Sequence, residues 1–490
     1  MTPFSPNMKI CIIGAGTYGS YLLKRLLEEY PANTDITVIE VGNHKTRSET
    51  EIGISSQSEQ SKAAKAGRYF GLGGTSARWG GQILFFDKRD NIDNDPTWQK
   101  IIKINAAFQN IVFDKLLKNN NLHKYFDANE GNIKMGLWLK YAHRNLFKHI
   151  PKGQLDRVNI IKNHRVIDFH THNGLLTDIL CQNTEGVTKT VEADRFYLTA
   201  GAIESCRLLL ELQEQYGIAD GTDLGKNFGD HLSVELFKIE NTEPRLEKTS
   251  ILPILHQGNL ITKRLVVQSK EGRVGYAHPI FNKEVKIFST IKQFLFGKQK
   301  LSFSFSDLLE GIVFLSKFAY HIFILKKMYA HKNNWSVQLD IEQAFPNENT
   351  LTLGEKTDTF GQREIVINWQ VSDSDKQTIA ELQGSMTRLL KDNNIEGTPI
   401  YNTEIATTKI EDIYHPVGFI RLGDDLQSVV NWDYSVKGIP NLYHFSTALF
   451  PSAKSINPTA AGFCFIEHHL SLCKFFKYHL PISQPISTVV

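Results

Sequence analysis

The sequence has few cysteines and none of the spacings that metal or redox centres require. Its five cysteines among 490 residues include no C-x-x-C pair and no pattern of metal ligands, so we expect no metal site. Most of them fall within apolar runs, which indicates buried free thiols in a reducing compartment. The first apolar strand begins almost at the N-terminus and leaves no room for a signal peptide, which favours a cytoplasmic protein.

The sequence also lacks a strong net charge, internal repeats and low-complexity tracts. A formal net charge of +3 gives no electrostatic argument for nucleic-acid binding. The longest apolar piece, Phe305–Met328, is interrupted by Glu310, Lys317, Lys326 and Lys327, which argues against a transmembrane span. We favour an amphipathic helix packed in the core or in a subunit contact over one that touches a membrane surface.

The composition is that of an ordinary globular protein, with 41% hydrophobic and 22% charged residues. A chain of this length favours two lobes over one compact domain.

A nucleotide-binding pattern stands at the start of the chain. Lys9–Ile13 is a short β-branched run typical of a buried strand, and Gly14, Gly16 and Gly19 follow it as G-x-G-x-x-G before an expected helix over Ser20–Leu27. A second strand, Ile36–Ile39, ends in Glu40, 21 residues beyond Gly19. A chance glycine triplet is the alternative. The full order of strand, glycines, helix, strand and acid instead predicts a site for an ADP moiety.

Two further stretches suit close contact with a ligand. Residues 67–81 hold six glycines among aromatic residues, a composition that fits backbone laid against a flat ligand better than a flexible linker. Val191–Leu198 predicts a strand that enters a small-residue turn and then a helix over Cys206–Leu212, which is a second βα unit of dinucleotide-binding type.

These pieces, in this order, resemble the glucose–methanol–choline (GMC) oxidoreductase family of flavoproteins. The motifs are GAGTYG with Glu40, GLGGTSARWGGQ, LTAGAIESCRLLL, LGKNFGDH, EQAFPNENTLTL, YHPVGFIRLG and SINPTAAG. The motif style is nearest to that of pyranose oxidases and related sugar or glycoside oxidoreductases. Nothing in residues 92–155 or 240–335 falls on the family pattern.

The resemblance implies a bound FAD. The residues that it places at the ADP half, beside the isoalloxazine, at the adenine or at the flavin N1/O2 edge are Gly14, Gly16, Thr17, Tyr18, Gly19, Glu40, Gly74, Thr75, Ser76, Trp79, Gly80, Gly81, Val166, Ala200, Gly201, Pro458 and Thr459. Arg78 stands where pyranose oxidases carry the histidine that bonds covalently to FAD, so we expect non-covalent FAD.

The resemblance also implies the catalytic residues. His415 falls where the family keeps its catalytic histidine, and Asn457 falls where it keeps a histidine or asparagine partner. A neutral imidazole is suited to accept the hydroxyl proton as hydride leaves the carbon, and an amide can hold the alcohol oxygen. The alternatives are that His415 is a turn residue, or that His444 is the base.

The expected fold class is α/β, with a Rossmann-like FAD-binding domain and a discontinuous α+β substrate domain built on an antiparallel sheet. We assign residues 1–91, 156–235 and 411–480 to the FAD-binding domain, with the catalytic pair in the last part. Residues 92–155 are read as a helical insertion or cap, 236–410 as the substrate domain and 481–490 as a tail.

The predicted function is FAD-dependent oxidation of a CH–OH group, with hydride transfer to flavin N5 and an external electron acceptor. A secondary hydroxyl of a sugar or glycoside is the first expectation for the substrate, and a lipid-like or secondary-metabolite alcohol is the alternative. An NAD-dependent dehydrogenase would not need the later motifs, and a non-catalytic flavin-binding protein would not need His415 and Asn457. A homo-oligomer is possible.

Overall fold

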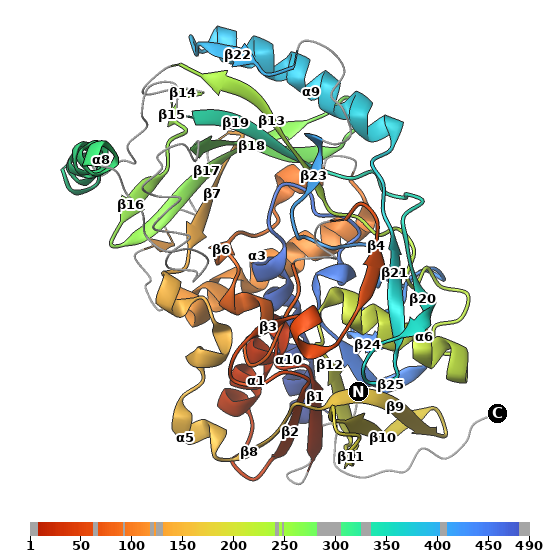
Figure 1. Cartoon of the computed structure of the whole chain (residues 1–490). Coiled ribbons are helices and arrows are strands. Elements are labelled where there is room, and N and C mark those ends of the chain that lie inside the picture. The colour runs from red at the N-terminus through yellow and green to blue at the C-terminus, as the bar shows by residue number, and fades with distance from the viewer. Residues whose placement is uncertain are drawn as a thin grey trace.

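The computed structural model describes residues 8–61, 67–91, 94–117, 122–123, 131–240, 245–246, 249–281, 305–324, 335–401 and 409–479. Figure 1 shows two sheets at opposite ends of the molecule, with helices around them. One continuous cluster of buried apolar side chains runs through both sheets, from Ile12 in the first to Leu339 in the second.

The first sheet has six strands, and all of its pairs are parallel except the one at its edge. Its order is β24 (Ser435–Val436), β25 (Ile439–His444), β12 (Arg195–Leu198), β1 (Lys9–Ile13), β2 (Asp35–Glu40), β8 (Val158–Lys162). The strand order reverses at β1, between β2 and β12. In such a sheet, ligands bind at this switch point, outside the carboxyl ends of the strands.

The second sheet has nine strands, and all of its pairs are antiparallel. Its main path is β22 (Gly397–Pro399), β13 (His231–Ile239), β19 (Trp335–Glu342), β18 (Val274–Phe281), β17 (Asn259–Gln268), β7 (Ile133–Trp138), β6 (Gln82–Ile83), with β16 (Ile254–His256) on β17 and β23 (Glu411–Asp412) on β13. The predicted fold class, a Rossmann-like domain joined to an antiparallel substrate sheet, is therefore confirmed.

Helices and smaller sheets complete the described chain. The α-helices are α1 (Thr17–Glu29), α3 (Pro96–Leu117), α5 (Lys152–Leu155), α6 (Ala202–Tyr216), α8 (Phe305–Phe323), α9 (Asp373–Asp392) and α10 (Thr459–His479). The remaining strands are β3 (Arg47–Ser48), β4 (Ser56–Ser58), β5 (Tyr69–Phe70), β9 (Arg165–His172), β10 (Leu175–Gln182), β11 (Thr188–Glu192), β14 (Arg245–Leu246), β15 (Thr249–Ser250), β20 (Thr350–Thr357) and β21 (Arg363–Asn368). Short 3-10 turns are η1 (Thr50–Ile52), η2 (Gly74–Ala77), η3 (Lys88–Asp90), η5 (Tyr141–His143), η6 (Leu146–His149) and η8 (Thr447–Leu449).

The helical reading of residues 92–155 holds for α3 but is wrong for β7. Residues 133–138 pair with β17 and β6 and so form part of the antiparallel sheet. Lys134 in this strand is buried and donates to Asp90 and Ser455, a partnership that local sequence cannot reveal. The domain bounds themselves remain predictions.

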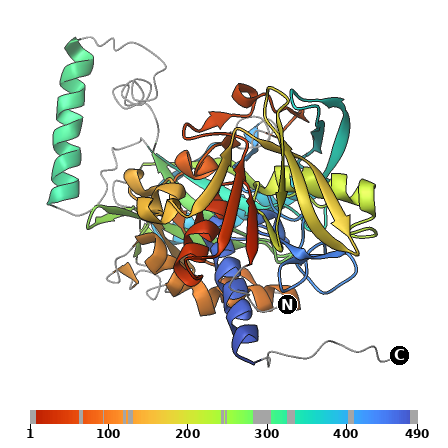
Figure 2. The same ribbon diagram turned by 90° about the horizontal axis from the view of Figure 1, so that it is seen from below.

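The long apolar segment forms α8, which does not pack in the core or in the wall of the site, while the expected subunit contact stays a prediction. Ile312 is 58% exposed and Leu315 is 43% exposed, so these side chains line no core and no wall of a site. In Figures 1 and 2, α8 stands away from the rest of the described chain. Residues 325–328 of the predicted segment lie outside the described residues. Among the described helices, none is both long and apolar enough to cross a membrane.

Candidate active site

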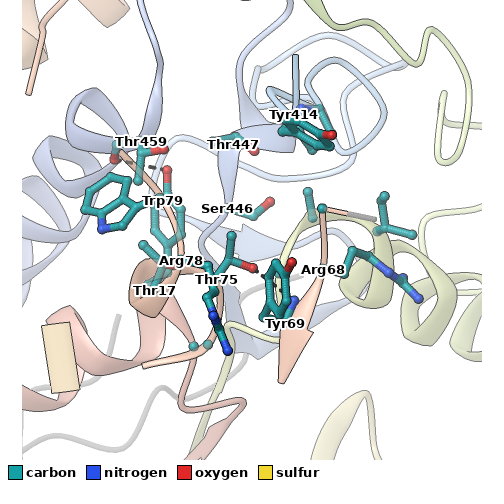
Figure 3. A pocket seen from close by; sticks show the side chains of 18 of the residues that line it. Thr17, Arg68, Tyr69, Thr75, Arg78, Trp79, Tyr414, Ser446, Thr447 and Thr459 are labelled. Atoms are coloured by element: carbon teal, nitrogen blue, oxygen red, sulfur yellow. Dashed lines mark hydrogen bonds between the residues drawn. The ribbon is translucent and has the colours of Figure 1, made fainter. Parts of the chain in front are cut away.

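A cavity of about 1590 Å³ lies between the carboxyl ends of the parallel strands and the nine-stranded sheet. Figure 3 shows Trp79, Thr17 and Thr459 toward one side of it and Arg68 toward the other, with Ser446 between them. The predicted site residues that line it are Gly14, Gly16, Thr17, Tyr18, Glu40, Gly74, Thr75, Trp79, Gly80, Gly81, Val166, Ala200, Gly201, His415, Asn457 and Thr459. Its volume exceeds the usual range of roughly 300–1,000 Å³ for a small-molecule site, so a large cofactor and a substrate can share it.

Three predicted site residues lie beside the cavity and do not line it. Gly19 packs α1 onto β1. Ser76 is buried, where its hydroxyl donates to the Gly73 carbonyl at 2.5 Å and accepts from Leu146 N–H. Pro458 precedes α10, and its carbonyl accepts from Gly462 N–H at 3.0 Å in the first turn. These residues hold the surrounding backbone in place.

The glycines of the first motif have different structural roles. A Cβ on Gly19 would lie 1.9 Å from the Gly14 carbonyl oxygen, and a Cβ on Gly14 would lie 2.6 Å from Ala200 Cα. At both positions any side chain would clash with the protein's own backbone, so only glycine fits. A Cβ on Gly16 would meet nothing within 4 Å, although Gly16 lines the cavity at the start of α1. A bound pyrophosphate at the helix N-terminus explains this glycine, so the residues fit FAD.

Glu40 lines the cavity, and its carboxylate also binds the backbone of three segments that surround the cavity. Its carboxylate accepts N–H donors from Ala15 at 2.8 Å, Gly42 at 2.9 Å and Gly71 at 2.9 Å. Burial raises the pKa of this carboxyl, and the three donors oppose that rise. A carboxylate offers about four acceptor positions, so one remains for a ribose hydroxyl.

The glycine-rich loop lies against the first motif and an indole ring. Gly73 N–H donates to the Ala15 carbonyl at 2.8 Å. A Cβ on Gly80 would lie 2.4 Å from the Trp138 ring. Trp79 donates from its indole nitrogen to the Arg144 carbonyl at 2.9 Å, which holds its ring in the cavity wall. The predicted close backbone packing is present at this loop.

His415 lies on a short loop that a buried carboxylate holds. The His415 backbone N–H donates to both oxygens of Asp230 at 2.9 Å, and His231 N–H donates to the same carboxylate at 2.7 Å. Tyr414, just before His415, has φ +69°, a left-handed conformation that is strained for this residue type. The bonds to Asp230 therefore outweigh the conformational preference of Tyr414, and the loop places the His415 ring at the cavity.

A chain of hydrogen bonds fixes which nitrogen of His415 carries the proton. His231 Nε2 lies 2.7 Å from the Lys454 carbonyl, which can only accept, so this nitrogen donates. Burial lowers the pKa of His231 to about 4, so the ring is neutral and its Nδ1 is an acceptor. His415 Nδ1 lies 3.1 Å from that Nδ1 and must donate to it. The Nε2 atom of His415 therefore keeps a free lone pair.

Asn457 is oriented by two donors from the antiparallel sheet. Its Oδ1 accepts from Arg264 Nη2 at 2.7 Å and from the Tyr276 hydroxyl at 3.2 Å. An arginine can only donate, so the amide NH₂ of Asn457 is left to donate elsewhere. Asn457 also lies two residues before α10, whose N-terminus meets the cavity at Thr459. A helix N-terminus favours negative charge on a ligand there.

His444, the alternative base, is fully occupied. Its Nδ1 lies 2.9 Å from the Leu198 carbonyl and its Nε2 lies 2.8 Å from the Ser446 hydroxyl. The ring is completely buried and does not line the cavity, and burial lowers its pKa to about 4. His444 therefore supports the β25 end of the sheet and offers no free lone pair to a substrate.

Sequence reasoning missed several groups of the site. The residues of the antiparallel sheet that line the cavity and that no motif indicated are Trp138, Thr262, Arg264, Tyr276, His278, Gln338 and Asp340. Thr262 and Arg264 alternate along β17, but nothing local says which face of that strand meets the site. The motif LGKNFGDH was recognised without a role for His231.

Asp230, His231 and His415 also place potential ligand atoms within 4.8 Å of one another. Asp230 already accepts backbone N–H groups with both oxygens, and His231 is bonded at both nitrogens. We assign this cluster to the hydrogen-bond chain. The expectation of no metal stays a prediction.

The fold and the cavity together fit a flavin-dependent oxidoreductase. Residues 346–464 match the family model described as GMC oxidoreductase. Pyridoxine 4-oxidase from Mesorbium loti has a similar structure, with TM-score 0.59 and 15% identity over 97% of this chain and 100% of that one. Formate oxidase has TM-score 0.56 and 14% identity over 97% and 99% of the two chains.

The match to the family model covers the C-terminal part of the chain and agrees with the family that the motifs predicted, and it indicates an enzyme of the oxidoreductase class that uses FAD. Among curated proteins, none matches the sequence. Variants of formate oxidase from Aspergillus oryzae RIB40, made to study FAD modification, have similar folds at TM-score 0.56 and 13% identity, over 97% of this chain and 99% of theirs.

Proposed function

We propose that the protein oxidises a CH–OH group of a small-molecule alcohol, with His415 as the general base. The observation that carries this proposal is the free lone pair on His415 Nε2, left at the cavity by the bond from Nδ1 to His231. FAD, when bound, supplies the hydride acceptor. His415 then takes the hydroxyl proton, and the Asn457 amide donates to the alcohol oxygen.

A sugar or glycoside remains the proposed substrate. The wall opposite the first motif offers the Trp138 ring, a surface suited to the apolar face of a sugar ring. Polar groups of β18 and β19, elsewhere on the same sheet, also line the cavity, where His278 Nε2 and Gln338 Nε2 both contact Asp340, at 3.0 and 2.8 Å. Such planar groups suit adjacent hydroxyls. The wall also shields the reacting atoms from bulk water.

Non-covalent FAD is part of the proposal, because Arg78 replaces a linking histidine. Arg78 lines the cavity with its guanidinium 5.5 Å from the Tyr69 ring centre. The described cysteines are all free and buried, which supports a cytoplasmic location.

We expect the purified protein to be yellow and to release its FAD into the supernatant when it is precipitated with acid. Absorbance spectra before and after precipitation measure this. Flavin that stays with the pellet would contradict non-covalent binding, and a colourless protein that takes up no added FAD would remove the proposed function. Anaerobic addition of sugars and other alcohols, followed by air, then identifies the substrate class and tests oxygen as acceptor.

Replacing His231 with alanine should slow flavin reduction by substrate about ten- to a hundredfold, a size typical of residues that orient a functional histidine. The reason is that His415 Nδ1 loses its acceptor, so its proton is free to move to Nε2. His231→Asn should recover much of the rate, because its Oδ1 can stand near the position of Nδ1. Stopped-flow reduction and FAD content check this. Equal rates in His231→Ala and His231→Asn would contradict the tautomer argument.

A further inference from the structure

Helix α8 carries apolar side chains that no described part of the chain covers. The exposed residues are Leu309 (52%), Ile312 (58%), Val313 (49%), Leu315 (43%), Tyr320 (54%), Phe323 (70%) and Ile324 (65%). At roughly 100° per residue, all except Leu315 fall within about 120° of one another around the helix axis. They form one apolar face, while Lys317 and His321 lie beyond its edge.

We propose that α8 docks on an anionic lipid surface and lies in the plane of the membrane. A helix with a wide apolar face and basic neighbours binds a membrane by burying that face at the boundary between headgroups and acyl chains. This contact is peripheral, with the helix axis parallel to the membrane plane. The rest of the molecule stays in water, with α8 projecting from it as Figure 2 shows.

The charge around α8 selects lipid over a second copy of the chain. Residues 283–332 hold nine lysines, no arginine and three acidic residues, whereas the whole chain has a net charge of only +3. The remainder of the chain is therefore slightly acidic, and the positive charge is concentrated in this segment. Lys317 is the one of these lysines that lies within the described residues; a second copy docked through α8 would add a second segment of the same net charge. An anionic membrane surface supplies the counter-charge instead.

This inference is independent of the alcohol chemistry, because α8 contributes no residue to the cavity. The cytoplasmic leaflet is the anionic surface that a cytoplasmic protein meets. An apolar face left in water is unfavourable, so the face of α8 requires a cover. A lipid surface covers this face without contact between α8 and the core.

Flotation of the full-length protein with vesicles tests the inference. The protein should float with vesicles of phosphatidylcholine and phosphatidylglycerol, and much less with vesicles of phosphatidylcholine alone. A double variant, Ile312→Asp with Phe323→Asp, should partition at least tenfold less. The matched control is Val187→Asp with Leu426→Asp, which places the same charges at positions that are 52% and 83% exposed elsewhere. The control should bind as the wild type does.

Several outcomes would overturn the inference. The first is absence of flotation with anionic vesicles, and the second is equal flotation of the two double variants. The third is a wild-type dimer in light scattering that becomes a monomer in the Ile312→Asp, Phe323→Asp variant. Binding that does not weaken with added salt would contradict the role of the lysines. FAD content and turnover of soluble alcohols should be the same in all variants, so a failure here is separate from a failure of the proposed function.

Discussion

Replacing His415 with alanine is expected to lower the rate constant for flavin reduction by substrate by about two to four powers of ten, the usual contribution of a general base. FAD content should not change, because the His415 ring is held by His231 and the Asp230 loop and not by the residues of the first motif. Anaerobic stopped-flow reduction gives the rate, and the flavin absorbance ratio gives the content. Asn457→Ala should be impaired less severely, because it removes a donor and leaves the base.

The pH profile of the same reaction gives an independent measure. Burial, together with the neighbouring His231 and Arg264, lowers the pKa of His415 well below its usual 6.5. The basic form is then already present at neutral pH, and the rate should fall only as pH drops through that lowered pKa. His170→Ala, on the exposed face of β9, should leave rate and profile unchanged. A substrate-reduction rate that survives in His415→Ala would show that another group is the base.

The sequence reveals the parallel sheet and its glycines because their signals are local. The run Lys9–Ile13 becomes β1 with its predicted bounds, and the expected helix over Ser20–Leu27 lies inside α1. A strand, a tight turn and a helix start each depend on a few neighbouring residues. The placement of Gly16 at the cavity follows from the same short unit.

The wall of the site could not be predicted in the same way. Arg264 and Tyr276 reach Asn457 only because β17 and β18 are neighbours in a nine-stranded sheet, and that order depends on long-range pairing. The role of His231 depends on a carbonyl at Lys454, 223 residues away. The apolar residues of α8 predict that its face is covered, because exposure of such a face is unfavourable in water, but hydrophobicity does not say what covers it.

Replacing Gly16 with valine is expected to abolish FAD binding while the protein still folds. The new side chain meets no protein atom within 4 Å of its Cβ, so it projects into the cavity where the pyrophosphate must approach the backbone. A positive φ is not the reason, because Gly16 has φ −71°. The ratio of flavin absorbance to protein absorbance should fall to near zero. The unfolding temperature should match that of wild-type protein stripped of its flavin.

Gly19→Ala is the matched control in the same motif. Its Cβ would lie 1.9 Å from the Gly14 oxygen and 2.7 Å from the Thr199 hydroxyl, so α1 must move away from β1. That variant should lose folding stability by about 1–3 kcal/mol or more, the range for overpacked cores, and should lose FAD only as a consequence. If Gly16→Val kept its FAD, the phosphate site would lie elsewhere. If it unfolded as Gly19→Ala does, Gly16 would serve packing and not the ligand.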